Sequence, residues 1–209
     1  NTLFLSDDEE SLLTDFQFEL FKALNEEESL SVSAPTSAGK SFVLTLNLIE
    51  KLKSKMGQCI VYVVPTRALI TEVSKRIRDA LKQSNISEVL VRTAPFPVDE
   101  ESSPAGIVYV LTQERLMSYI GSAEGTPRIT SLIVDEAHEI QNGNRGVILE
   151  SAIDIVVKKF EIDSIFFASP LIKNPSYFLS LFGRESSGKY FVETVSPVSQ
   201  NIISISDVH

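Results

Sequence analysis

The sequence predicts an α/β domain with a mostly parallel β-sheet that is flanked by helices. Runs rich in Val and Ile alternate with amphipathic helical patterns from residue 30 onward. Several of these runs are almost continuously apolar, which suits strands that helices cover on both faces. Alternating strands and helices favour a parallel sheet with right-handed crossovers. The expected strands lie at residues 30–33, 59–64, 88–92, 107–111, 131–134 and 164–168.

Helical patterns occupy the segments between these runs. Apolar residues recur every three or four positions at residues 69–81 and 147–156, which gives each segment one apolar stripe. Residues 40–52 are at first apolar on nearly every side, as in a helix packed under a sheet. The remaining expected elements are an amphipathic helix at 12–24, a loop at 184–189 and a last pair of strands at 190–192 and 202–205.

Composition and charge are those of an ordinary globular protein with acidic loops. The 209 residues are 43% hydrophobic and 22% charged, with a net charge of −9. Acidic residues are concentrated in three runs, at 7–10, 26–28 and 99–101, and without these runs the chain would be close to neutral. We expect the runs to be solvated loops. The overall charge argues against a broad basic sheath for duplex DNA.

Cysteine usage and hydropathy point to a soluble protein of the cytoplasm or the nucleus. Cys59 is the single cysteine, so no internal disulfide can form, and no Cys/His cluster has metal-ligand spacing. The longest apolar run, at 59–64, is too short for a membrane span, and the first residues do not resemble a signal peptide. The missing initiator Met and the end at residues 207–209 suggest a fragment of a longer protein.

Residues 34–41, Ala-Pro-Thr-Ser-Ala-Gly-Lys-Ser, match a phosphate-binding loop with Ala in place of the first Gly. The segment lies between an expected strand and an expected helix, where loop amides and the positive helix end can surround a polyphosphate. We expect Lys40 to contact the outer phosphates and the Ser41 hydroxyl to ligate Mg²⁺. The alternative is a glycine turn that caps a helix. The predicted nucleotide contacts are Thr36, Ser37, Ala38, Gly39, Lys40 and Ser41.

An acidic box, Asp135-Glu136-Ala137-His138, follows the expected strand at 131–134. Ligands bind at the carboxyl edge of such parallel sheets. There Asp135 could hold Mg²⁺, directly or through water, and Glu136 could orient and deprotonate an attacking water. Alone, these four residues could be any acidic strand end. Their position about 95 residues after the phosphate loop, with strands between, favours the catalytic interpretation.

The two segments resemble motifs I and II of superfamily 2 helicases of the DExH (DEAD/DEAH) type, and the resemblance extends over nearly the whole chain. Residues 14–17 resemble the glutamine motif, 64–69 resemble motif Ia and 111–116 resemble motif Ib. Finer features resemble the superkiller-type (exosome-associated) and repair-type branch; these are residues 32–40, the Arg145-Gly146 pair and Ser196-Pro197-Val198.

The resemblance implies the first of two RecA-like motor domains, a P-loop NTPase domain that binds ATP and Mg²⁺. It implies residues 1–29 as an N-terminal helix with the glutamine motif and residues 30–209 as the ATP-binding domain. Gln17 would read the adenine edge, and His138 would link the acidic box to motif III. The arginine finger would come from the second RecA-like domain, so the isolated fragment should be weakly active or inactive. The implied contacts to the backbone of a single strand are Thr66, Arg67, Thr112, Gln113 and Arg115.

Motif III departs from the family pattern, because Ser169-Pro170-Leu171 stands where the family has Ser-Ala-Thr. Ser169 is retained as the coupling residue, but the Thr hydroxyl is gone and the Pro removes a backbone donor. Two other functions stay open: a duplex translocase, since such enzymes share motifs I and II, and a nucleotide-gated binding module whose altered motif III has lost productive coupling. Ordinary structural roles also stay open for single residues. Gln17, Arg67 and Arg115 could be solvated surface residues, and His138 could be a buried histidine.

Overall fold

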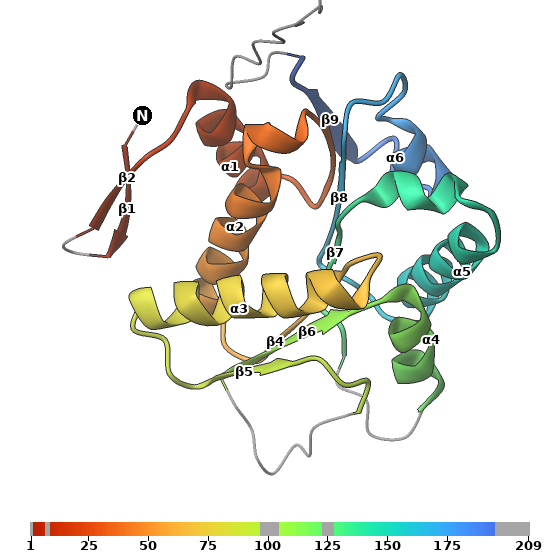
Figure 1. Ribbon diagram of the computed structural model, residues 1–209, viewed down its shortest axis with the longest axis horizontal. Coiled ribbons are helices and arrows are strands. Elements are labelled where there is room, and N and C mark those ends of the chain that lie inside the picture. Colours follow the sequence, from red (N-terminus) through yellow and green to blue (C-terminus); the bar gives the residue numbers. More distant parts are fainter. Residues whose placement is uncertain (1, 7–8, 97–104, 123–127, 195–209) are drawn as a thin grey trace, which may run out of the picture.

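The computed structural model describes residues 2–6, 9–96, 105–122 and 128–194 (Figure 1). The strands of the main sheet are β3 (Ser29–Ser33), β4 (Gln58–Val63), β5 (Val89–Arg92), β6 (Gly106–Leu111), β7 (Ser131–Val134), β8 (Ser164–Ser169) and β9 (Gly188–Val192). The helices are α1 (Asp15–Glu26), α2 (Lys40–Ser54), α3 (Arg67–Gln83), α4 (Gln113–Gly121), α5 (Gly143–Lys159) and α6 (Tyr177–Leu181), with 3₁₀ turns η1 (Thr36–Ala38) and η3 (Ala137–Gln141).

The seven strands form one sheet in the order β5-β6-β4-β7-β8-β3-β9, and every pair is parallel. The predicted α/β fold with a parallel sheet is therefore confirmed. Each of the six expected apolar runs corresponds to a strand, and residues 190–192 belong to β9. The expected partner strand at 202–205 and the acidic run at 99–101 lie outside the described residues.

Two layers of helices explain why the strands are apolar on both faces. Along β4, Val61 and Val63 pack in a cluster that contains residues of α4 and α5. The alternate residues Ile60 and Tyr62 pack in a second cluster with residues of α1, α2 and α3. Figure 1 shows α2 and α3 on the side of the sheet away from α5. Because period-two alternation sends neighbouring side chains to opposite faces, both faces of the central strands must be apolar.

The N-terminal region differs from the prediction in two respects. Leu12 ends a strand, β2 (Glu9–Leu12), which pairs antiparallel with β1 (Thr2–Ser6), so part of the acidic run at 7–10 is strand rather than loop. The expected helix at 12–24 begins only at Asp15. Thr14 caps it, because its side chain accepts a hydrogen bond from the Gln17 backbone N–H while the Gln17 side chain accepts one from the Thr14 N–H.

Helix α1 belongs to the same packed body as the sheet. Leu20 and Leu24 are almost fully buried, and both lie in the core cluster that contains Val43 and Leu44 of α2. The expected division at residue 29 therefore separates sequence motifs rather than hydrophobic cores. Within the described part of the chain, no helix is long and apolar enough to cross a bilayer.

Candidate nucleotide site and nucleic-acid interface

The parallel sheet brings the predicted site residues to one edge. Strand β3 leads into the phosphate loop, and β7 leads into the acidic box. Only β8 separates these two strands, and Ser169 is its last residue. Because all strands run the same way, their carboxyl ends meet at the edge where ligands bind in open α/β sheets.

The phosphate loop closes around the Lys40 ammonium. Lys40 is the first residue of α2 and is 6% exposed, and its Nζ donates to the carbonyl oxygens of Ala34 at 2.6 Å and Pro35 at 3.0 Å. Burial lowers the pKa of Lys40, and the Glu136 and Asp135 carboxylates act in the opposite direction. The Lys40 ammonium therefore lies at the N-terminus of α2, where a polyphosphate can interact with both the lysine charge and the helix dipole.

Gln17 packs directly on the phosphate loop. Its Nε2 donates to the Ala38 carbonyl oxygen at 3.1 Å, while its Oε1 accepts from the Thr14 N–H. Gly39 has φ +83°, and a Cβ atom on it would lie 2.4 Å from Gln17 Nε2. Only glycine fits this position, because the backbone is left-handed and the Gln17 amide occupies the space of a side chain. The glutamine motif and the phosphate loop are therefore one structural unit.

Asp135 is held by three hydrogen bonds. Its Oδ2 accepts from the Ser41 hydroxyl at 3.0 Å and from the Tyr62 hydroxyl at 2.8 Å, and its Oδ1 accepts from the Glu136 N–H at 3.0 Å. Sequence reasoning found Ser41 and Asp135 but missed Tyr62. The feature that could have identified Tyr62 was its hydroxyl, a polar group within the apolar run of β4.

The Ser41 hydroxyl and the Asp135 carboxylate fit a magnesium ion. Both groups offer hard oxygen atoms, and their hydrogen bond shows that they lie within ligand distance of each other. Among the described residues there is no group of three or more His, Cys, Asp or Glu that could hold a metal alone. That is the usual situation for Mg²⁺, which takes one or two protein oxygens and fills its shell with phosphates and water.

Glu136 has the properties of a general base. It lies in a left-handed backbone conformation with φ 55° and is half-buried. Burial raises the pKa of Glu136, the Asp135 charge raises it further, and His138 and Lys40 act in the opposite direction. A carboxylate of raised pKa accepts a proton more readily than an ordinary surface glutamate.

His138 and Ser169 lie near this site but contact different groups. His138 Nδ1 lies 3.3 Å from Glu136 Oε2, and its Nε2 lies 3.7 Å from Glu139 Oε1. The Ser169 hydroxyl donates to the Val32 carbonyl oxygen at 3.4 Å. The expected histidine link to motif III is not among these contacts.

Ser33, which sequence reasoning did not single out, ties the segment after β8 to β3. Its hydroxyl donates to the Pro170 carbonyl oxygen at 3.1 Å and accepts from the Ile172 N–H at 2.9 Å. Ser33 is the last residue of the strand that enters the phosphate loop. The altered motif III is therefore connected to the nucleotide site through β3.

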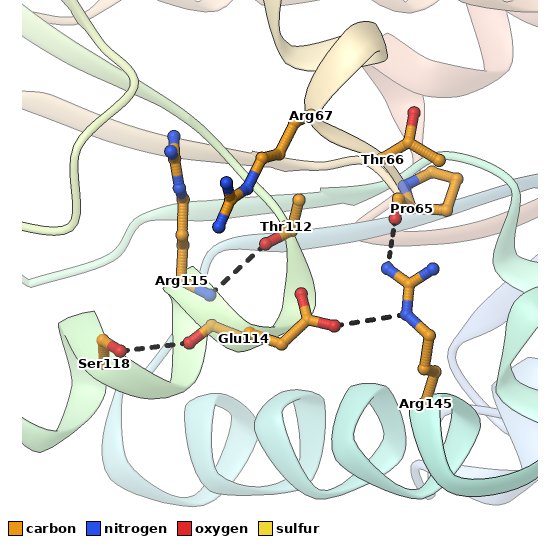
Figure 2. A pocket seen from close by; sticks show the side chains of 8 residues that line it. All are labelled: Pro65, Thr66, Arg67, Thr112, Glu114, Arg115, Ser118 and Arg145. Carbon is orange, nitrogen blue, oxygen red and sulfur yellow. Dashed lines mark hydrogen bonds and ion pairs between the residues drawn. The ribbon is translucent and has the colours of Figure 1, made fainter.

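Motifs Ia and Ib form a hollow of about 400 Å³ at the same edge (Figure 2). Thr66 and Thr112 cap α3 and α4, accepting hydrogen bonds from the N–H groups of Leu69 and Arg115. Figure 2 shows the Arg67 and Arg115 side chains reaching toward the same space from these two helices. Helix N-termini and arginines are the donors that bind phosphates without reading bases.

Two residues differ from the predicted set of nucleic-acid contacts. Gln113 is 2% exposed and does not line the hollow, so it is not brought to the expected interface. Arg145 does line it, donating from Nε to Glu114 Oε1 at 3.2 Å and from Nη2 to the Pro65 carbonyl oxygen. The Arg145-Gly146 pair in the sequence was the signal for this residue.

These features define the class of protein: a phosphate-loop nucleotide-binding domain with a second, basic site beside it. The chain matches the DEAD/DEAH box helicase family over residues 14–174. It belongs to that family, and its parallel α/β fold is the RecA-like helicase domain. The resemblance to DExH-type helicases seen in the sequence is thereby confirmed.

Two relatives agree with this assignment. The chain is 34% identical over 148 residues to the DExH-box ATP-dependent RNA helicase DExH9 of Arabidopsis thaliana, covering 70% of this chain and 14% of that protein. It is 27% identical over 151 residues to the ATP-dependent DNA helicase Hel308 of Pyrococcus abyssi, covering 72% of this chain and 20% of that protein. The chain therefore spans a fifth or less of the length of these two relatives.

A solved structure supports the fold at lower sequence similarity. The yeast DEAD-box splicing factor Prp28 superimposes with a TM-score of 0.62 at 16% identity, covering 83% of this chain and 43% of that chain. At this identity the likeness establishes the RecA-like fold alone.

We predict that Gly146→Ala destabilises the chain although alanine is the better helix former. A Cβ at Gly146 would lie 2.1 Å from the Ile140 carbonyl oxygen, in η3 beside the acidic box. Overpacking of this kind costs ~1–3 kcal/mol, which exceeds or cancels the ~1 kcal/mol gained in helix propensity. Gly121→Ala is the matched control, because among the described residues no atom outside its own helical turn lies within 4 Å of its Cβ position. Equal unfolding midpoints of the two variants in urea would contradict the close packing of α5 on η3.

Proposed function

We propose that this chain is the ATP-binding motor domain of an ATP-dependent nucleic-acid helicase. Joined to a second RecA-like domain, it would hydrolyse ATP with Mg²⁺ and use the cycle to move along or unwind DNA or RNA. The observation that carries the proposal is the Ser41–Asp135 hydrogen bond, because Lys40 and Glu136 both lie close enough to Asp135 to interact with its charge. A phosphate contact, a metal-ligand pair and a general base would then lie together at one edge of the sheet.

Each residue has a definite part in this proposal. Lys40 and the N-terminal amides of α2 bind the outer phosphates, and Gln17 orients the adenine beside the loop. Ser41 and Asp135 hold the metal, which when bound neutralises charge on the phosphates. Glu136 orients the attacking water and accepts its proton. Phosphoryl transfer depends on such positioning and charge stabilisation rather than on covalent chemistry by the protein.

The basic hollow supports nucleic acid as the partner. Thr66, Arg67, Thr112 and Arg115 offer hydroxyl and guanidinium donors, with two helix N-termini behind them. Contacts of this kind position a strand through its phosphates and do not distinguish base sequences. Cys59 is the single cysteine, so the chain has no internal disulfide, as is usual in a reducing compartment; we propose the cytoplasm or the nucleus as the location.

We predict that two substitutions separate nucleotide binding from hydrolysis. In the full-length protein, Lys40→Ala should strongly weaken the binding of a fluorescent ATP analogue, because the phosphates lose their buried cation. Glu136→Gln should retain that binding, while hydrolysis falls ~10²- to 10⁴-fold with the loss of the base. Fluorescence titration and phosphate release measure the two steps. Wild-type affinity of the Lys40 variant would refute the phosphate-loop assignment, and turnover near wild type in the Glu136 variant would refute the base.

We predict that residues 1–209 alone bind nucleotide but show no strand-stimulated hydrolysis. An arginine finger is worth ~10³- to 10⁵-fold in related NTPases, and we propose that here it comes from the second RecA-like domain. Phosphate release should be measured with and without single strands, alongside a full-length control. Robust stimulation of the isolated domain would overturn this division of labour, or would show that a second copy supplies the finger.

A further inference from the structure

A second hollow adjoins the motif Ia and Ib hollow and shares Arg67 and Arg115 with it. It has a volume of about 460 Å³ and extends along α3 toward the end of β5. Two further cations line it, Lys75 and Arg78, together with Thr71. Lys75 and Arg78 lie outside every segment that resembles a helicase motif.

The charge around this hollow is uncompensated. Four cations line it and no carboxylate does. None of the four has an ion pair among the described residues, whereas the nearby Arg76 and Arg145 are paired with Glu72 and Glu114. Like charges gathered without partners repel one another, on a chain whose net charge is −9. Such a local excess is the electrostatic footprint of a polyanion site.

Backbone carbonyls hold two of these cations in place. Arg78 Nη2 donates to the Val91 carbonyl oxygen at 3.3 Å, and Arg115 Nη1 donates to the Thr93 carbonyl oxygen at 2.6 Å. Each guanidinium has five N–H donors, so these bonds leave donors for a ligand. Both side chains are thereby positioned at the rim before any ligand binds.

We propose that this second hollow holds the phosphate backbone of the bound strand beyond motifs Ia and Ib, with Lys75 as one of its phosphate contacts. The inference rests on the proposed nucleic-acid function. Lys75 follows Arg67 by eight residues on α3, which is ~12 Å along the helix axis. A stacked strand covers that distance in roughly four nucleotides, at ~3.4 Å each. Four cations and an exposed threonine along two adjoining hollows suit a polynucleotide better than an acidic protein segment.

The test compares Lys75→Glu with Lys82→Glu in the full-length protein. Lys82 is exposed, lies on the same helix and lines neither hollow, so it matches the change in total charge. Fluorescence anisotropy with homopolymeric single strands of increasing length, over a range of salt, gives affinity and salt slope. Lys75→Glu should weaken the binding of long strands by about 5-fold or more. It should also lower the slope of log affinity against log salt concentration by roughly 0.7 in magnitude. The two variants should bind the shortest strands with equal affinity.

The outcomes separate this inference from the function on which it rests. If Arg67→Ala weakens strand binding while Lys75→Glu behaves like Lys82→Glu at every length, the strand does not reach the second hollow. If none of these variants changes strand binding, the proposed nucleic-acid site is itself wrong. If Lys75→Glu changes binding of an acidic peptide and leaves strands unaffected, the hollow serves a protein partner and the inference falls.

A separate observation concerns Tyr62, which lies beneath the metal-ligand pair. Tyr62 is wholly buried in the centre of the sheet, and its hydroxyl donates to Asp135 Oδ2, the oxygen that also accepts from Ser41. The remaining Asp135 oxygen accepts from the Glu136 N–H.

The geometry points to Tyr62 as a positioning residue that fixes the Asp135 carboxylate for the metal. Removing the phenol hydroxyl would free Asp135 to rotate away from Ser41. Outer hydrogen-bond partners of metal ligands typically change metal affinity ~10- to 100-fold when they are lost. A purely structural tyrosine would change stability and leave metal affinity unaltered.

The test compares Tyr62→Phe with Tyr109→Phe in the full-length protein. Tyr109 is equally buried in β6, and its hydroxyl donates to the Phe96 carbonyl oxygen, away from the metal-ligand pair. Both variants lose a buried hydroxyl, but only Tyr62→Phe should weaken Mn²⁺ binding in the presence of ADP, by roughly 10-fold in electron paramagnetic resonance titrations. Binding of metal-free ADP should be unchanged. Equal Mn²⁺ affinity of the two variants would overturn the positioning role.

Discussion

The hydrogen bond from the Ser41 hydroxyl to the Asp135 carboxylate is the contact on which the candidate site depends. It joins residues that are 94 positions apart in the chain. Nothing local brings them together, because they follow strands β3 and β7, which are separated by β8. The contact exists because parallel strands end at one edge and because helices on both faces hold those strands in a fixed order. The chemistry of the site is therefore a consequence of sheet topology.

That constraint explains which parts of the fold could be predicted from the sequence. Strands buried on both faces are mostly apolar, so β4 and β8 appear as nearly continuous apolar runs that could be located within about a residue. The β1–β2 pair has no such requirement and was missed, as was the start of α1, which depends on reciprocal side-chain bonds between Thr14 and Gln17. Short strands and capping bonds leave weak or ambiguous patterns in a single sequence.

The candidate site was predictable where chemistry fixes both residue type and spacing, and less so elsewhere. The phosphate loop and acidic box had to contain Lys40, Ser41 and Asp135 at recognisable positions relative to strands. Which neighbouring side chains face the site depends on rotation about each helix, and that is set by packing. Gln113 consequently lies buried beside residues that line the hollow, and Arg145 enters from α5, which packs against α4.

A continuous series of contacts connects the acidic box with the basic hollow. Gly146 lets the first turn of α5 lie against the carbonyls of η3, the 3₁₀ turn that contains His138. The adjacent Arg145 donates to the Pro65 carbonyl oxygen of motif Ia and pairs with Glu114 of motif Ib. A bulkier residue at 146 would separate α5 from η3, and Arg145 would lose its reach to both motifs. Since close-packed backbone transmits displacement rather than absorbing it, the Arg145-Gly146 pair connects the acidic box to the basic hollow through direct contacts.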